Sequence, residues 1–376
     1  MKILFAMFSM LMFMNPVFAQ RDNKNQFYML VGTYTAGGST GIYVFRFDTE
    51  TGASEYVSEV KALNPTYLAI SADERFVYSV GENSEKKAVV YAFSFDKQTG
   101  RLNLLNMEPI NSSGACYVST DRLARFVVTA NYAGGTASVL PLAADGTLQP
   151  VVKVFEFEGS GPDVRRQDKP RLHCAFFSPD QRYLFAPDLG TDKLHKFAVS
   201  GTTPFLTIGA PEAYSLEPGS GPRHLTFHPN GKFAYLINEL SGKVTVFHYA
   251  DGHLEPVQYI ASDTTSGEGG KGSADIHVSP DGRFLYASNR ANTNNITIFR
   301  INATDGKLTV AGFQPTGLHP RNFVITPNGK FLLAANRDSN SIQVFEIDKE
   351  TGLLKEDTTK QINSVDKPVC LKFVNY

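Results

Sequence analysis

A repeated pattern with a period near fifty residues constrains the fold of this chain more than any other feature. Each copy has a short apolar run, a turn rich in Pro, Asn, Asp and Gly, a second apolar run and then a third. Residues 221–247 show it well: a Pro-Arg pair, the turn at 228–231 and apolar residues at 244–247. Short β-rich runs separated by such turns indicate antiparallel strands. A period of this length predicts a propeller or a solenoid.

The aromatic residue that follows each turn gives the alignment of the repeats. Successive aromatics are 50, 57, 50, 51 and 47 residues apart, and a weaker fourth run follows each third run, often after an Asp/Gly turn. The pattern therefore predicts six units of four strands. The aligned aromatics are Phe76, Phe126, Tyr183, Phe233, Phe284 and Phe331.

The two ends of the chain supply a seventh unit. Residues 367–373 match the first strand at 64–70 but have no further strands after them. Residues 27–35 and 41–47 match a second and a third strand with no first strand before them. One C-terminal strand would complete the N-terminal blade and remove the bare sheet edges of an open array. The prediction is an all-β fold, a seven-bladed β-propeller of four-stranded blades, because no stretch shows sustained helical periodicity.

The first 19 residues differ in composition from the repeats. Lys2 precedes an apolar run at 3–14, and Val17-Phe18-Ala19 ends in a small residue before Gln20. A basic start, a short apolar core and a small residue at the boundary are typical of a secretory signal peptide. We expect residues 1–19 to be removed, leaving a single domain at 20–376 that is periplasmic or secreted. If the segment is instead part of the fold, the protein stays in the cytoplasm.

The composition gives no support for several classes of binding partner. The formal net charge is −1, which gives no reason to expect nucleic acid or an anionic membrane as partner. Three cysteines without a close pair indicate no disulfide framework. We expect a monomer that binds a small molecule.

The repeat alignment also places two polar positions of each blade on the same rim, near the axis. The residue ten before the aromatic opens the innermost strand, and the residue six after it ends the antiparallel second strand. The first position holds Thr66, Cys116, His173, Arg223, Ala274, Arg321 and Val369. The second holds Glu82, Tyr132, Leu189, Glu239, Arg290 and Arg337, with Thr33 beside Tyr34 in the closing blade. One residue before the second position are Asn131, Asp188, Asn238, Asn289 and Asn336.

These rim residues are rich in arginine, whose planar guanidinium suits bidentate binding of a carboxylate or phosphate. Structural roles compete with this interpretation. Arg223 and Arg321 each follow a proline that the turn itself needs, and His173 precedes an apolar run that would suit a core histidine. The Asn series suits strand ends, where Asn bonds its own backbone. We read His224, His228 and His277 as structural, and Asp73, Asp180 and Asp281 as turn residues.

The sequence resembles the lactonase family of seven-bladed propellers, which includes propeller-type 6-phosphogluconolactonases and carboxymuconate cyclases. The resemblance runs from about Tyr28 to Phe373. Its most specific segments are GTYTAGGSTGIYVFRFD (32–48), ANYAGGTASVLPL (130–142), LHCAFFSPDQRYLFAPDLGTDKL (172–194), GPRHLTFHPNGKFAYLINE (221–239), SPDGRFLYASNRANTNNI (279–296) and GLHPRNFVITPNGKFLLAANRDSNSIQVF (317–345). The resemblance implies active residues at His173, Arg223, Glu239 and Arg290, all of which are rim positions of the alignment. Many relatives have a second His where this chain has Arg171, and the segment 159–171 adds basic residues at the rim.

Hydrolysis of a sugar lactone, most simply a 6-phosphogluconolactone, is the function this resemblance implies. It needs a base to activate water and cations for the oxyanion. Glu239 or His173 can be the base, with a slight preference for Glu239, whose Arg neighbours keep it ionised but weaken it as a base. Arg223 and Arg290 would hold negative charge. No Ser lies at the strand-to-helix turn of a G-x-S-x-G elbow, so a covalent acyl-enzyme is not favoured. We expect no cofactor and no metal, because no metal-ligand spacing is present. The expected substrate-binding residues are Arg321, Arg337, Glu82, Tyr132, Asn131, Asp188, Asn289 and Asn336.

Three other functions remain open at this point. A carboxymuconate cyclase-like enzyme would form the lactone rather than open it. A Ca²⁺-dependent lactonase would use Asp188 and the Asn series as oxygen ligands, although interleaved arginines disfavour a cation there. A non-catalytic exported propeller would use the rim to bind another protein, and the absence of Trp disfavours the tryptophan–aspartate type of scaffold.

Overall fold

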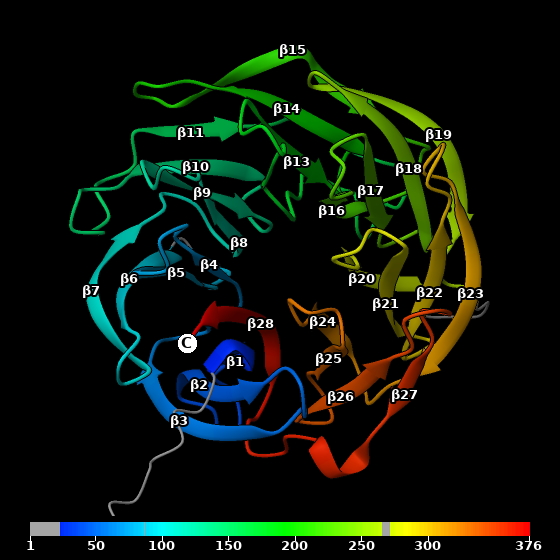
Figure 1. Cartoon of the computed structure of the whole chain (residues 1–376). Helices are drawn as coiled ribbons and strands as arrows, with labels where there is room; N and C mark the ends of the chain where they lie inside the picture. Colours follow the sequence, from blue (N-terminus) through cyan, green and yellow to red (C-terminus); the bar gives the residue numbers. More distant parts are fainter. Residues whose placement is uncertain (1–22, 86, 265–270) are drawn as a thin grey trace, which may run out of the picture.

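The computed structural model describes residues 23–85, 87–264 and 271–376, and these form a ring of seven sheets (Figure 1). In this part of the chain, 28 strands make seven four-stranded antiparallel sheets. Two short 3₁₀ helices, η1 (Asn23–Asn25) and η2 (Thr358–Lys360), are the helical elements among them. The predicted seven-bladed β-propeller is therefore confirmed.

Each blade begins at the axis and ends at the outside of the ring. The innermost strands are β28 (Pro368–Asn375), β4 (Leu68–Ile70), β8 (Ala115–Thr120), β12 (Phe176–Phe177), β16 (Pro222–Phe227), β20 (Lys271–Val278) and β24 (Pro320–Ile325). The second strands are β1 (Gln26–Thr33), β5 (Phe76–Gly81), β9 (Phe126–Asn131), β13 (Tyr183–Asp188), β17 (Phe233–Asn238), β21 (Phe284–Ala291) and β25 (Phe331–Asn336).

The outer half of each blade consists of a mostly buried third strand and a more exposed outermost strand. The third strands are β2 (Gly41–Asp48), β6 (Val89–Asp96), β10 (Thr136–Pro141), β14 (Lys193–Val199), β18 (Lys243–Ala250), β22 (Asn295–Ile301) and β26 (Ser341–Ile347). The outermost strands are β3 (Ser54–Lys61), β7 (Arg101–Pro109), β11 (Lys153–Glu156), β15 (Leu206–Ser215), β19 (His253–Ala261), β23 (Leu308–Pro315) and β27 (Leu354–Glu356).

The two ends of the chain close the ring in one sheet, as predicted. Its strand order is β28-β1-β2-β3, so the last strand of the chain is the innermost strand of the first blade. Figure 1 shows β28 in red beside β1 in blue. The register pairs Val31 with Leu371 and Met29 with Phe373. Closure pairs the inner edge of β1, which would otherwise be bare.

A recurring contact between neighbouring blades explains why the aligned aromatic recurs. Every aligned aromatic is the first residue of its second strand. The ring of Phe233 lies against Gly306, in the turn after the third strand of the next blade, where an added Cβ would come within 2.5 Å of it. Tyr235, two residues after Phe233, donates a 3.0 Å hydrogen bond to the carbonyl of the same glycine. The same arrangement recurs at Gly146 with Phe76 and Tyr78, and at Gly352 with Phe284 and Tyr286.

The repeat therefore encodes both the strands and the contacts that hold the blades in a ring. Gly306 has φ +71°, a conformation that side chains other than glycine rarely adopt. Its position in the turn thus requires glycine for the backbone as well as for the close approach of the aromatic ring.

Further observations concern the cysteines, membrane-spanning segments and the N-terminus. All three cysteines are free and buried, in agreement with the absence of a disulfide framework. None of the helices in the described ranges is long and apolar enough to cross a membrane. The predicted signal peptide at residues 1–19 lies outside the described residues.

Candidate active site

The innermost strands present the first rim residues to the axis through a recurring irregularity. In β16, Pro222 pairs with Asn238 and His224 with Ile237, so Arg223 is left out of the ladder. The ladders of β8, β20, β24 and β28 shift register at the equivalent place. A β-bulge of this kind bends the strand and re-aims the side chain of the extra residue. The bulges explain how residues of different blades come together at the axis.

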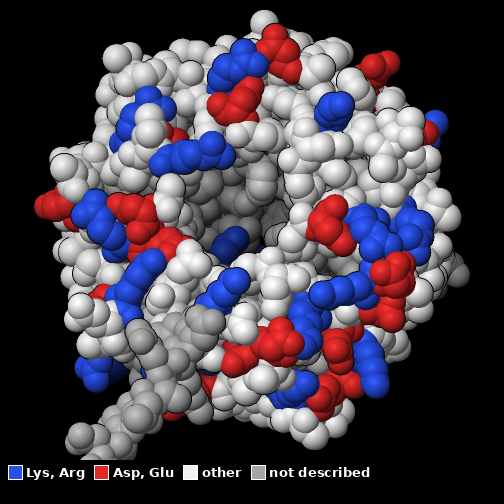
Figure 2. Space-filling model, in the orientation of Figure 1, with Lys and Arg blue, Asp and Glu red and all other residues white. Residues whose placement is uncertain are grey.

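A cavity of about 350 Å³ lies where these side chains meet. Figure 2 shows that the ring is also hollowed at its centre on the face in view. Strong burial and a concentration of charged groups are typical of ligand-binding and catalytic sites. The cavity is lined by Tyr34, Glu82, Cys116, Tyr132, Arg166, His173, Glu239, Lys271, Gly272, Arg290, Ala291, His319 and Arg321.

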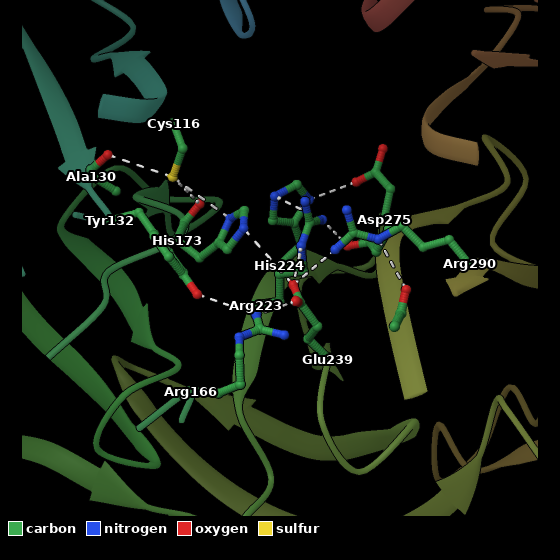
Figure 3. Close-up of polar contacts among 12 residues, drawn as sticks. Cys116, Ala130, Tyr132, Arg166, His173, Arg223, His224, Glu239, Asp275 and Arg290 are labelled. Carbon is green, nitrogen blue, oxygen red and sulfur yellow. Dashed lines mark hydrogen bonds and ion pairs between the residues drawn. The ribbon is translucent and has the colours of Figure 1, made fainter. Parts of the chain in front are cut away.

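Glu239 is at the centre of the charged groups, and three guanidinium groups contact it (Figure 3). Its Oε1 accepts a 2.7 Å hydrogen bond from Nη2 of Arg166. Its Oε2 accepts a 2.9 Å hydrogen bond from Nη2 of Arg290 and lies 2.9 Å from Nε of Arg223. Glu239 follows β17, and its three partners come from the loop before β12, from β16 and from β21. Contacts across blades therefore create this cluster.

The charge of Glu239 follows from these contacts. Burial alone would raise the pKa of its carboxyl group, but Arg290, Arg223 and Arg166 together lower that pKa to about 2. Burial also lowers the pKa of Arg290, against the opposing effect of Glu239, to about 9. At neutral pH the cluster thus holds one carboxylate and three guanidinium cations, an excess of positive charge.

His173 is next to this cluster and is neutral at neutral pH. Its side chain is buried, and burial followed by the charge of Arg223 lowers its pKa well below the usual value. Its Nε2 lies 3.9 Å from Oε2 of Glu239, and its Nδ1 lies 3.7 Å from the sulfur of Cys116. Burial raises the pKa of the Cys116 thiol, so the sulfur remains protonated.

A second group of polar side chains includes Arg321, Tyr34 and Glu82. Oε2 of Glu82 accepts hydrogen bonds from the hydroxyls of Tyr34 at 2.9 Å and Thr66 at 2.7 Å. Burial raises the pKa of Tyr34 to about 12. The guanidinium of Arg321 lies over the Tyr34 ring, 5.6 Å from its centroid. Among the described residues it has no carboxylate within 4.0 Å, in contrast to the three arginines around Glu239.

Arg166 is a site residue that the repeat alignment did not find. It lies in the segment 159–171, which lengthens one interval of the repeat and brings extra basic residues to the rim. A turn holds it in place, because Oδ1 of Asp163 accepts hydrogen bonds from the backbone N–H groups of Arg165 and Arg166. Nη2 of Arg166 also donates to the Tyr132 hydroxyl at 3.2 Å. The inserted basic segment was the signal that could have predicted this role.

His319 also lines the cavity, and no repeat position had indicated it. Its Nε2 is 3.0 Å from Nη1 of Arg290. Burial, followed by the charges of Arg290 and Arg337, lowers the pKa of His319 to about 3, so its neutral ring can accept that hydrogen bond. The LHPRN segment places it two residues before Arg321.

Other predicted site residues are near the cavity but do not line it. Arg223 is almost fully buried beneath it, in contact with Glu239. Arg337 forms a bidentate ion pair with the neighbouring Asp338. The four remaining candidates are fully buried and bond within their own blades or to adjacent loops: Asn131, Asp188, Asn289 and Asn336.

Asp188 shows why these buried groups differ from the cavity residues. Its carboxylate accepts hydrogen bonds from the backbone N–H groups of Arg171 and Gly190 and from the Thr191 hydroxyl. Both oxygens thus hold the loop after β13. The structure therefore brings Glu239, His173, Arg290, Arg321, Glu82 and Tyr132 together at the cavity, and it directs the Asn series and Asp188 to strand ends.

A seven-bladed propeller with an arginine-rich axial cavity defines the class of this protein. The family model "Lactonase, 7-bladed beta-propeller" matches residues 28–373, and the chain belongs to this family. Two relatives are named 6-phosphogluconolactonase. One, from Bacillus subtilis, is 40% identical over 92% of this chain and 97% of its own length. The other, from Formosa agariphila, is 39% identical over 87% of this chain and 94% of its own length.

Solved structures of similar proteins share the whole ring. A Bacteroides fragilis protein, described as a "putative 6-phosphogluconolactonase", has 53% sequence identity and a TM-score of 0.90 over 94% of this chain and 99% of its own. The periplasmic gluconolactonase of Pseudomonas aeruginosa has 34% identity and a TM-score of 0.87 over 93% and 99% of the two chains. The similarity thus extends over nearly the whole ring.

Proposed function

We propose that this protein is a lactonase that hydrolyses a sugar lactone, of which a 6-phosphogluconolactone is the best candidate. The observation that carries the proposal is the axial cavity, where an excess of guanidinium groups surrounds one carboxylate and a neutral histidine. Opening a lactone needs a proton acceptor for water and positive charge for the oxyanion. The names of the relatives support the same chemistry.

The reaction can be written with this chain's own residues. Water attacks the lactone carbonyl carbon while its proton passes to a base, and the carbonyl oxygen becomes an oxyanion. The bond between the carbonyl carbon and the ring oxygen then breaks, and the ring oxygen takes the proton back from the conjugate acid of that base. The product is a hydroxy acid, which loses a proton to water. Guanidinium groups at the cavity stabilise the oxyanion, as preorganised donors do in other acyl transfers.

The contacts favour His173 over Glu239 as the base in this scheme. Both oxygens of Glu239 contact guanidinium groups, and a carboxyl group with a pKa of about 2 is a weak proton acceptor. His173 is neutral and, within the described part of the chain, has a ring nitrogen free of guanidinium contacts. Although burial and Arg223 lower the pKa of His173 too, Glu239, 3.9 Å away, would offset part of that effect in the imidazolium that forms. For Nε2 to accept the proton, the ring hydrogen must be on Nδ1, where the Cys116 sulfur is a weak acceptor.

Arg321 is the residue that we assign to an anionic group of the substrate. Arg166, Arg223 and Arg290 all contact Glu239 directly, whereas Arg321 has no carboxylate within 4.0 Å among the residues described, and Glu82 and Glu239 act on it only from farther away. A guanidinium in a cavity without a direct carboxylate contact favours an anion such as a phosphate or a carboxylate. We therefore propose that the lactone carries such a group and that Arg321 binds it.

Comparing two substrates tests this assignment. Glucono-1,5-lactone and its 6-phosphate should both be hydrolysed by the parent protein, the phosphorylated one with the higher kcat/KM. Arg321→Gln should lower kcat/KM for the phosphorylated lactone by about 10- to 100-fold, chiefly through KM, and change the other little. Arg283→Gln is the matched control, because Arg283 precedes β21 at the end opposite to the cavity and pairs with Glu350.

The same assay separates the alternative functions. Equal losses on both lactones would contradict the assignment of Arg321 to the anionic group. A parent protein that opens neither lactone, but forms a lactone from an unsaturated dicarboxylic acid, would instead be a cyclase. A protein without turnover in either direction would contradict the proposed lactonase function altogether.

We also propose that the protein is exported, on the basis of residues 1–19 alone. The basic start and the apolar run ending at Val17-Phe18-Ala19 support cleavage near Gln20. The intact mass of protein purified from its native cell tests this, and we expect a chain that begins at Gln20 or a near neighbour. A chain that retains Met1 to Ala19 would contradict export.

A further inference from the structure

A chain of buried polar residues lies behind Glu239, and the proposed mechanism does not use it. Arg223 contacts Glu239 through Nε, and its Nη1 lies 3.4 Å from Nε2 of His224. Nδ1 of His224 is 2.8 Å from Oδ1 of Asp275. His224 and Asp275 are both buried, with exposed fractions of 5% and 2%. Figure 3 shows His224 between Arg223 and Asp275.

One irregularity in β20 supplies two of these contacts. The ladder between β20 and β21 shifts register between Ser273 and Ile276, so Ala274 and Asp275 lie at the bulge. The carbonyl of Ala274 accepts a hydrogen bond from Nη1 of Arg223, and the carboxylate of Asp275 contacts His224. Ala274 occupies the rim position that holds Arg or His in neighbouring blades, and its small side chain has little bulk beside the guanidinium.

We propose that Asp275 and His224 are positioning residues that hold Arg223 against Glu239. The argument rests on donors and acceptors. A guanidinium can only donate, so the contact with Arg223 requires a lone pair on Nε2 of His224. A carboxylate can only accept, so Asp275 requires the hydrogen on Nδ1. Together they fix a single tautomer of the neutral ring, as carboxylate–histidine pairs do where a histidine must keep one orientation.

The surroundings of His224 support a permanently neutral ring. Burial, followed by the charge of Arg223, lowers its pKa to about 4 although Asp275 acts in the opposite direction. The ring is also next to His173 and the stacked pair Tyr67 and Tyr117.

Asp275 is held independently from the other side. It accepts hydrogen bonds from Nδ2 of Asn322 and from the backbone N–H of Phe323, and it contacts His277 at 2.9 Å. The carboxylate thus stays in place without His224.

This inference rests on the proposed lactonase function, so its kinetic test uses the lactone that the parent protein hydrolyses best. His224→Leu removes the acceptor for Arg223 and keeps an apolar side chain of similar reach. It should lower kcat by about 10- to 100-fold, because Arg223 would no longer be held against Glu239 and small displacements of the groups in a site can cost that much. His224→Gln can present its amide oxygen to Arg223 and should recover most of this loss. His277→Gln is the matched control, since His277 shares Asp275 but does not contact Arg223.

A second measurement does not depend on turnover. In the parent protein, labelled with ¹⁵N in histidine, the nitrogen shifts of His224 should show the Nδ1–H tautomer unchanged from pH 5 to pH 9. Asp275→Asn should lose this fixed tautomer, because an amide can donate as well as accept. If the parent protein hydrolyses no lactone, the proposed function fails, but this measurement still decides whether Asp275 fixes the ring.

Three results would overturn the inference. One is a His224 ring that carries its hydrogen on Nε2 or titrates near pH 6.5 in the parent protein. Another is a folded His224→Leu variant with the parent kcat. The third is a His224→Gln variant that is no more active than His224→Leu. A purely structural role of His224 predicts no rescue by a restored hydrogen-bond acceptor, whereas the positioning role requires it.

Discussion

Removing the C-terminal strand should unfold the ring. In β28, the side chains of Val369, Leu371 and Val374 are at most 2% exposed. Burying an apolar side chain of this size contributes about 1.5–3 kcal/mol, so the three together contribute roughly 5–9 kcal/mol. The free energy of unfolding of a whole domain is only about 5–15 kcal/mol. Deleting residues 367–376 would also leave the inner edge of β1 unpaired along its length, with β2 as its remaining partner. We expect the truncated chain to lose cooperative unfolding.

A single substitution gives a graded form of the same prediction. Leu371 belongs to a buried cluster that joins the first blade to the last one, with Val31 of β1 and Leu333 of β25 among its members. Leu371→Ala should cost about 2–5 kcal/mol through lost burial and the cavity left behind. The corresponding fall in Tm is roughly 3–7 °C for a domain of this size. Leu123→Ala is the control, because Leu123 is 73% exposed and should change the free energy of unfolding by less than about 0.5 kcal/mol.

Thermal unfolding followed by circular dichroism, with urea titration at 25 °C, measures both effects. If the truncated chain melted cooperatively at the parent temperature, the ends of the chain would not meet in one blade. If Leu371→Ala and Leu123→Ala gave the same Tm, burial of β28 would not contribute to the stability of the ring.

Three further predictions concern the site and the blade contacts. His173→Asn should lower kcat by about 10²–10⁴-fold with KM little changed, and Glu239→Gln should lower kcat by about 10²-fold or more. Full kcat in His173→Asn would return the role of base to Glu239. Full kcat in Glu239→Gln would contradict the assignment of this cavity as the active site. Because the pKa of Glu239 is lowered to about 2 from an ordinary value of 4.5, its contribution to stability is complete above pH 4.5 and is lost as the pH falls towards 2. Urea unfolding between pH 7 and pH 3 should thus show a steeper loss in the parent than in Glu239→Gln, and equal slopes would contradict this. Gly306→Ala should lower Tm, because its Cβ would meet the Phe233 ring and its φ is positive. Gly231→Ala is the control and should lower Tm less, because Gly231 has φ +70° but open space around it. Equal losses of Tm would contradict the contact between the blades.

The fold could be predicted from the sequence because the information that specifies it is local. An aromatic such as Phe233 that follows a turn starts the second strand in six of the seven blades, and the repeat makes the same local signal visible many times. The incomplete units at the two ends of the chain also predicted their own pairing, because only one blade lacked an innermost strand. The rim positions followed in turn, since both ends of an antiparallel pair are fixed once the turn between them is known.

The partners of each rim residue were decided only by the tertiary structure. Which side chain leaves the ladder depends on bulges such as the one at Arg223, and no repeat spacing reveals where its guanidinium then points. Arg166 reaches Glu239 from a loop outside the repeat, so its role depends on the conformation of that loop. The repeat alignment places Asp188 and Asn289 next to the rim positions, but their side chains form hydrogen bonds within their own blades. A buried polar side chain needs a hydrogen-bond partner, and the nearest ones are there. Contacts across the axis join residues from different blades, and only the closed ring brings them together.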